Sequence, residues 1–225
     1  DFARLGQFER AQEVAESLLN VPGAFLQRSQ ARALADQLEI RVLLSEADAE
    51  TWPLTSQKLA SYPPSLPKLL ALDELKQRKA AGTENAAQAA VAQVIKAADY
   101  LDRATTDAER RQMIGIFASW LRQSKDAADT RQGLAKLVEL SARVVQPAWR
   151  APTLCDLGYT ARQLAPELKE ALFAEGVSLA EELARRGQEN PRPSATGACA
   201  YWRAQAGDQE EAIVLRELPM GWLGG

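Results

Sequence analysis

The spacing of apolar residues constrains this 225-residue chain more than any other feature, because they recur at three- and four-residue steps along most of its length. Met113, Ile114, Phe117, Trp120 and Leu121 show the pattern clearly. No segment sustains the alternation of apolar and polar residues that a half-buried strand would show. We therefore predict an all-α protein of about ten helices joined by short corners rich in Gly and Pro.

Short corners make consecutive helices antiparallel, so the pairs form either a stack of hairpins or a closed bundle. The densest cluster of helix breakers in the first half is residues 63–67, where we expect a turn or linker. We therefore divide the chain into N-terminal helical hairpins at 1–62 and a main helical-repeat region at 63–225, continuous with the first. Thr106 and Ser194 are predicted N-caps.

One corner, at Gly207, is expected to join the last two helices. Glycine ends a helix at little cost, because it adopts the left-handed backbone conformation without a Cβ penalty. Asp208, Glu210 and Glu211 follow, where carboxylates complement free N–H groups and the helix dipole. Ala212 is small enough to let the two helices approach closely. Gly6 and Ala11 repeat the device near the start of the chain.

These corners resemble the tetratricopeptide repeat, in which Gly-x-aromatic-x-x-Ala marks the passage between two helices. Gly6–Ala11 carries Phe8 at the aromatic position, and Gly207–Ala212 carries Gln209 there. Gly82–Ala87 is a third, weaker match. The resemblance implies an irregular α-solenoid whose concave groove binds a peptide or partner protein without catalysis. A compact helical bundle is the alternative fold.

Composition excludes several classes of function. The chain has no histidine, which removes Ser-His-Asp and Cys-His catalysis and every HExxH metal site. A net charge of −3 argues against a dedicated nucleic-acid binder. No apolar run approaches the roughly 18 residues of a membrane span. We predict no metal and no cofactor, because the chain also lacks a phosphate-binding glycine loop and a dinucleotide fingerprint.

No catalytic residue is assigned. Nothing in the sequence marks one carboxylate as buried in an apolar pocket, which a raised catalytic pKa requires; those considered are Glu170, Glu175, Glu181 and Glu182.

Cys155 and Cys199 either form one bridge in an oxidising compartment or, as we expect, are packing residues on helix faces. The chain begins at Asp1, and we expect a fragment or a processed product. The compartment stays open: cytoplasmic, or periplasmic or secreted if a signal peptide precedes Asp1.

Aromatic residues are the strongest candidates for partner binding, because Trp and Tyr combine large area with a polar group. Trp149 and Arg150 lie between two prolines, which predicts an exposed loop. Tyr201 and Trp202 are adjacent, so at least one is expected to reach the surface. The other candidates are Tyr159 as a further groove aromatic, Arg28 and Arg32 as groove cations, and Trp120 as a core residue.

The sequence thus favours a non-catalytic scaffold or adaptor that binds a protein or peptide through a helical groove. Two alternatives remain: an accessory helical domain of an enzyme with carboxylate chemistry, and a ligand-sensing regulatory domain. Two buried carboxylates beside a closed pocket would favour the enzyme. A dry internal cavity would favour the sensor, and an open face with exposed Trp149 or Trp202 the scaffold.

Overall fold

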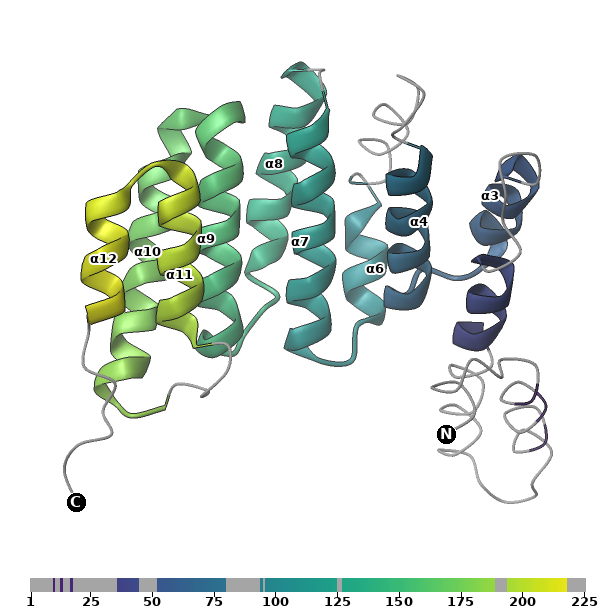
Figure 1. Ribbon diagram of the computed structural model, residues 1–225, viewed down its shortest axis with the longest axis horizontal. Coiled ribbons are helices and arrows are strands. Elements are labelled where there is room, and N and C mark those ends of the chain that lie inside the picture. Colours follow the sequence, from purple (N-terminus) through teal and green to yellow (C-terminus); the bar gives the residue numbers. More distant parts are fainter. Residues whose placement is uncertain are drawn as a thin grey trace. The chain divides into compact units, whose positions relative to one another are not determined.

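The computed structural model describes residues 10, 13, 17, 36–44, 52–79, 94, 96–124, 127–188 and 194–217. Every regular element in these residues is an α-helix and none is a β-strand, which confirms the all-α prediction (Figure 1). The chain divides into two compact units, residues 1–82 and residues 83–225.

The first unit contains a helical segment at 36–44, followed by α3 (Trp52–Ser61) and α4 (Leu66–Lys79). Lys68 Nζ donates hydrogen bonds to the carbonyl oxygens of Ala60, at 3.0 Å, and Tyr62, at 2.5 Å. The turn predicted at 63–67 joins α3 to α4, and both helices belong to the first unit. Its core consists of Ile40, Leu44, Leu59, Ala71 and Leu75, with Tyr62 and Leu72 packed against them.

The second unit is organised around α9, which packs against α7, α8, α10 and α11. Ala165 alone separates α9 from α10, so α10 turns straight back along α9. The helices of this unit are α6 (Ala97–Arg103), α7 (Asp107–Gln123), α8 (Ala127–Ser141), α9 (Pro147–Leu164), α10 (Pro166–Arg185), α11 (Ala195–Ala206) and α12 (Gln209–Glu217).

Prolines begin helices in this protein. Pro53 and Pro67 lie in the first turns of α3 and α4, and Pro147 and Pro166 are the first residues of α9 and α10. A first-turn residue has no intrahelical partner for its N–H, so proline costs nothing there. From the sequence, a loop is predicted at 149–150 because prolines flank these residues. This prediction was wrong, because Pro147 begins α9 and residues 149–150 lie in its first turn. Pro152 lies inside α9 instead of beginning it.

The predicted N-caps are confirmed. The Ser194 hydroxyl accepts a hydrogen bond from Gly197 N at 3.0 Å, and the Thr106 hydroxyl accepts one from Glu109 N at 3.2 Å. The carboxylate of Glu109 accepts a hydrogen bond from the backbone N–H of Thr105, at 2.7 Å, so the capping box is displaced by one residue.

The corner at Gly207 is confirmed. Gly207 has a φ of 91°, and the N–H of Asp208 bonds to the carbonyl of Arg203 at 3.0 Å, as in a Schellman motif. Ala212 is 4% exposed, so the small residue does lie in the contact between α11 and α12. Gly6 and Ala11 lie outside the described residues.

Asp208 makes ion pairs across this corner. Its carboxylate accepts hydrogen bonds from Lys169 Nζ at 2.8 Å and from Arg203 Nη1 at 3.1 Å. Burial opposes ionisation of Asp208, but the hydrogen bonds and charges of Lys169 and Arg203 outweigh it and hold its pKa below the usual range. The corner therefore also ties α10 to the last hairpin.

Gly176 lets α10 approach α9 closely. A Cβ atom at this position would lie 2.7 Å from Cys155 Sγ and 2.9 Å from the carbonyl oxygen of Ala151. Backbone of a packed helix cannot move aside at small cost, so only glycine fits here.

We expect Gly176→Ala to lower the free energy of unfolding by about 1–3 kcal/mol, because the methyl group overpacks the α9–α10 contact. The matched control is Gly115→Ala in α7, where the nearest atom to the new Cβ, Asp156 Oδ2, lies at 3.4 Å. This control should stabilise the protein by about 0.5–1 kcal/mol, as expected for glycine replaced in a helix interior. Urea unfolding measures both, and a Gly176→Ala protein as stable as wild type would contradict the packing.

The Asp208 ion pairs predict a pH effect. A carboxylate whose pKa is depressed in the folded state stabilises it above the unfolded pKa of about 3.9, and this contribution is lost as the pH falls through the folded value. We expect Asp208→Asn to be less stable than wild type at pH 7, with the difference shrinking below about pH 4. Urea unfolding at a series of pH values, with exposed Glu210→Gln as control, measures this. A difference independent of pH would show that the charge contributes nothing.

Candidate functional site

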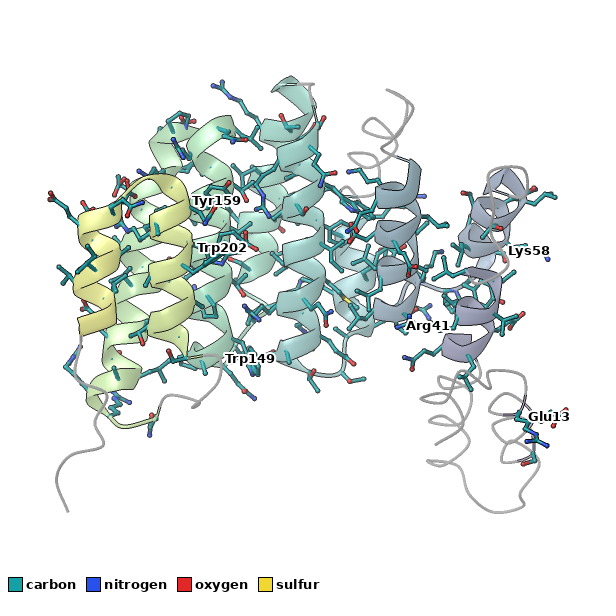
Figure 2. The ribbon with its side chains drawn as sticks, in the orientation of Figure 1. Glu13, Arg41, Lys58, Trp149, Tyr159 and Trp202 are labelled. Carbon is teal, nitrogen blue, oxygen red and sulfur yellow. A yellow bond between two sulfur atoms is a disulfide. The ribbon has the colours of Figure 1, made fainter. Side chains whose placement is uncertain are left out.

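Helix α9 adjoins both α7 and α11, and Tyr159 of α9 and Trp202 of α11 lie close together, whereas Trp149 lies at the lower end of α9 (Figure 2). Trp149 is half-buried in the first turn of α9, and Trp202 is half-buried on α11 beside Tyr201, which is 49% exposed. Trp120 is a core residue, as predicted, and packs edge-on against Phe117. Arg28 and Arg32 lie outside the described residues.

Tyr159 and Trp202 form a stacked pair between α9 and α11. Their ring centroids are 5.3 Å apart, with an interplanar angle of 24°. Tyr201 packs edge-on against Trp202 at 4.9 Å. The structure thus brings together three of the candidate aromatic residues, one of them largely accessible.

Arg122 of α7 covers both stacked rings. Its guanidinium carbon lies 5.3 Å from the centroid of Tyr159 and 5.5 Å from that of Trp202. Arg122 Nη1 is fixed by hydrogen bonds to Asp156 Oδ1 at 2.8 Å and to the Thr160 hydroxyl at 2.5 Å. The Thr160 hydroxyl in turn donates to the carbonyl of Asp156 at 2.9 Å. Arg122, Asp156 and Thr160 were not identified as site residues from the sequence. A local signal was present, because Asp156 lies one helical turn before Tyr159 and Thr160 on α9.

Asp156 is buried between two arginines of α7. Burial raises its pKa, and the nearby Arg122 and Arg111 guanidinium groups oppose that rise. Burial likewise lowers the pKa of Arg111, and the charge of Asp156 opposes that change. The carboxylate is therefore held by the cations beside it, a combination that stabilises a buried charge only where both partners are present.

Arg111 differs from Arg122 in its partners. Its guanidinium carbon lies 5.8 Å from the ring centroid of Trp149. Among the residues that the structure describes, no carboxylate or carbonyl oxygen accepts a hydrogen bond from the Arg111 side chain. Arg150, the neighbour of Trp149, is instead paired with Glu175 of α10 at 2.7 Å.

We call the exposed and half-buried side chains of this group the α7–α9–α11 face. It consists of Arg111 and Arg122 from α7, Trp149 and Tyr159 from α9, and Tyr201 and Trp202 from α11. Asp156 and Thr160 of α9 are buried and hold Arg122 from within.

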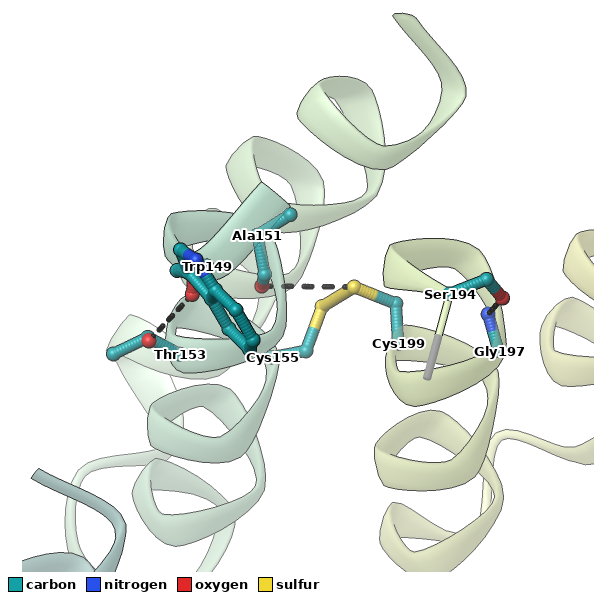
Figure 3. Close-up of a disulfide and its surroundings, with 7 residues drawn as sticks. All are labelled: Trp149, Ala151, Thr153, Cys155, Ser194, Gly197 and Cys199. Carbon is teal, nitrogen blue, oxygen red and sulfur yellow. Dashed lines mark hydrogen bonds between the residues drawn. A yellow bond between two sulfur atoms is a disulfide. The ribbon is translucent and has the colours of Figure 1, made fainter. Parts of the chain in front are cut away.

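Cys155 and Cys199 form a disulfide between α9 and α11 (Figure 3). Both are fully buried, so the packing part of the expectation holds, but they are bonded and not separate packing residues. Their Cα atoms lie 5.3 Å apart although 44 residues separate them in sequence. Among the dashed lines in Figure 3, the one that ends on Cys199 marks the 3.6 Å approach of its Sγ to the carbonyl of Ala151. A bonded sulfur has no proton, so this approach is a packing contact.

The disulfide lies next to the aromatic stack on both helices. Cys155 is one turn before Tyr159 on α9, and Cys199 is one turn before Trp202 on α11. The covalent bond and the ring stack therefore fix the same pair of helices at successive levels.

The first unit has a separate cavity of about 300 Å³ between the segment at 36–44 and α4. Ile40, Leu44 and Leu70 line it together with Asp73 and Glu74. Both carboxylates are half-buried, so the described lining of this cavity does not show the pair of buried carboxylates that would favour the enzyme alternative.

In the described part of the chain, no three His, Cys, Asp or Glu side chains cluster as metal ligands would. Within the same residues, no helix has both the length and the apolar composition needed to cross a bilayer. Comparison of the chain with family models, curated proteins and solved structures gave no match.

The disulfide predicts a stability effect. Closing a loop of this length contributes about 4 kcal/mol in the chain-entropy model, so we expect the double variant Cys155→Ala, Cys199→Ala to lose on this order. Urea unfolding measures the loss. The control is wild-type protein unfolded with a thiol reductant present, which should give a midpoint close to that of the double variant. An unchanged midpoint in both would contradict a stabilising role for the bond.

Proposed function

We propose that this protein is a non-catalytic scaffold or adaptor that binds a peptide or partner protein on its α7–α9–α11 face. The observation that carries the proposal is the fixed group of Arg122, Tyr159 and Trp202, contributed by three helices. Aromatic and arginine side chains are the residues that most often dominate binding energy at protein interfaces.

The arrangement of helices supports an irregular, tetratricopeptide-like solenoid. α7 with α8, α9 with α10, and α11 with α12 are consecutive packed pairs, and α9 contacts both α7 and α11. In such an array the first helices of successive pairs share one surface, which is where extended partners bind. The Gly207–Ala212 corner supports the same proposal, because it has the geometry that the resemblance implies.

Preorganisation is the physical reason to expect binding at this face. Ordering rotamer-rich side chains on association costs free energy, and a rigid surface avoids part of that cost. Here Arg122 is already held by Asp156 and Thr160, and the stack of Tyr159 on Trp202 is already formed. A partner would meet rings whose orientation is set before it arrives.

The disulfide supports the periplasmic or secreted alternative for localisation. Disulfides persist in oxidising compartments and are rare in the cytosol, where thiols are kept reduced. The Cys155–Cys199 bond is fully buried, as a structural disulfide usually is. We therefore propose that the protein works outside the reducing cytosol.

Selection of random peptides displayed on phage tests the function. Wild-type protein should enrich a family of related sequences whose affinity falls about tenfold or more in Trp202→Ala and Tyr201→Ser, the loss expected of interface anchors. Exposed Ile213 of α12 provides the control, because Ile213→Ala removes surface apolar area from a helix outside the face. Thermal unfolding checks that each variant is folded. Failure to enrich any family, or equal affinity in all four proteins, would contradict the proposal.

A further inference from the structure

The two arginines of the α7–α9–α11 face differ in whether their N–H donors have hydrogen-bond acceptors within the protein. Arg122 has a carboxylate and a hydroxyl as acceptors, at 2.8 Å and 2.5 Å. Arg111 has the Trp149 ring beside it and the charge of Asp156 nearby, but no hydrogen-bond acceptor among the described residues. None of the Arg111 nitrogens is among the buried polar atoms of the described residues that lack a partner, so its five N–H donors reach solvent and are open to an acceptor from a ligand.

The local charge also leaves room for an anion. One carboxylate, Asp156, lies between two guanidinium groups and is bonded to Arg122. Asp156 Oδ1 accepts the hydrogen bond of Arg122, whereas the guanidinium group of Arg111 has no carboxylate bonded to it in the part of the chain that the structure describes. A negatively charged group bound at Arg111 would pair with its guanidinium group as Asp156 pairs with that of Arg122.

Building on the proposed function, we infer that the partner is a peptide segment carrying an Asp or Glu side chain that pairs with Arg111. The same segment places an aromatic side chain on the Tyr159–Trp202 stack. Arg111 is thereby a binding residue, whereas Arg122 is a positioning residue that holds the stack.

A carboxylate suits Arg111 because a guanidinium group presents a planar pair of N–H donors that matches two carboxylate oxygens. The Trp149 ring lies against the guanidinium group and limits its freedom, so less side-chain entropy remains to be lost on pairing.

The length of the face sets the spacing of the two partner groups. Trp149, beside Arg111, and Tyr159 lie ten positions apart on α9. Ten positions of helix correspond to about 15 Å. An extended peptide advances about 3.3 Å per residue, so the acidic and aromatic side chains of the partner should lie four to five residues apart.

Synthetic peptides test this inference. Each is N-acetylated, C-amidated and fluorescein-labelled, and carries one Glu and one Trp in a Gly/Ser background, in either order, four or five residues apart. Matched peptides carry Gln or phosphoserine in place of Glu, carry a free C-terminal carboxylate in place of the Glu side chain, or place Glu and Trp next to each other. Fluorescence anisotropy measures binding to wild-type protein, Arg111→Gln and the charge-matched control Arg185→Gln, which alters an exposed residue at the end of α10.

We expect wild type and Arg185→Gln to bind the spaced Glu peptide in one of the two orders about tenfold tighter than its Gln counterpart, with a preference that weakens as salt is added. Arg111→Gln should lose this preference while binding the Gln peptide as wild type does, which shows that the variant is folded. Adjacent Glu and Trp should bind no better than Gln and Trp.

Equal binding of Glu and Gln peptides by wild type, or an unchanged preference in Arg111→Gln, would overturn the inference. A greater gain from a phosphoserine in place of Glu, or from a free C-terminal carboxylate, would also overturn the assignment of a carboxylate side chain. If phage selection yields peptides that depend on Trp202 but lack Asp and Glu, the proposed function stands and only the acidic contact fails. If selection yields nothing, the function itself fails.

Discussion

The packing of α9 against four neighbouring helices is the interaction on which the second unit depends. Small residues make that packing possible, because Gly176 admits the backbone of α9 and Gly158 admits the ring of Phe173. The same helix meets α7 and α11 through Asp156, Tyr159 and Thr160. Tyr159 and Trp202 pack against the buried cluster that contains Cys155 and Phe173, so the candidate binding face is built directly on the core of the unit.

Two non-local links hold the face in shape. The Cys155–Cys199 bond fixes α11 to α9 one turn away from the aromatic stack, and the Arg122–Asp156 pair fixes α7 to α9. Each link is buried or partly buried, where an ion pair is sensitive to the loss of either partner. Arg122 thus helps to build the candidate face, and Arg111 is the residue that we propose contacts a ligand.

Local patterns predicted the helices, the caps at Thr106 and Ser194 and the corner at Gly207, because each depends on residues within a few positions of one another. The start of α9 was not predicted, since Pro147 marks the end of one helix and the beginning of the next equally well. The ion pair and the disulfide join residues 34 and 44 positions apart, and no short pattern in the sequence encodes such pairs. Trp149 and Trp202 could be proposed from residue type alone, whereas Arg111 and Arg122 emerged only once α7 was placed beside α9.

Amide hydrogen exchange, measured with and without a saturating peptide obtained from phage selection, tests the central claim most directly. The account predicts slower exchange on binding in α7, α9 and α11, strongest in the turns that carry Arg111, Tyr159 and Trp202, with α10 and the first unit unchanged. Protection confined to α8, α10 or α12, or centred on the cavity between residues 36–44 and α4, would contradict it.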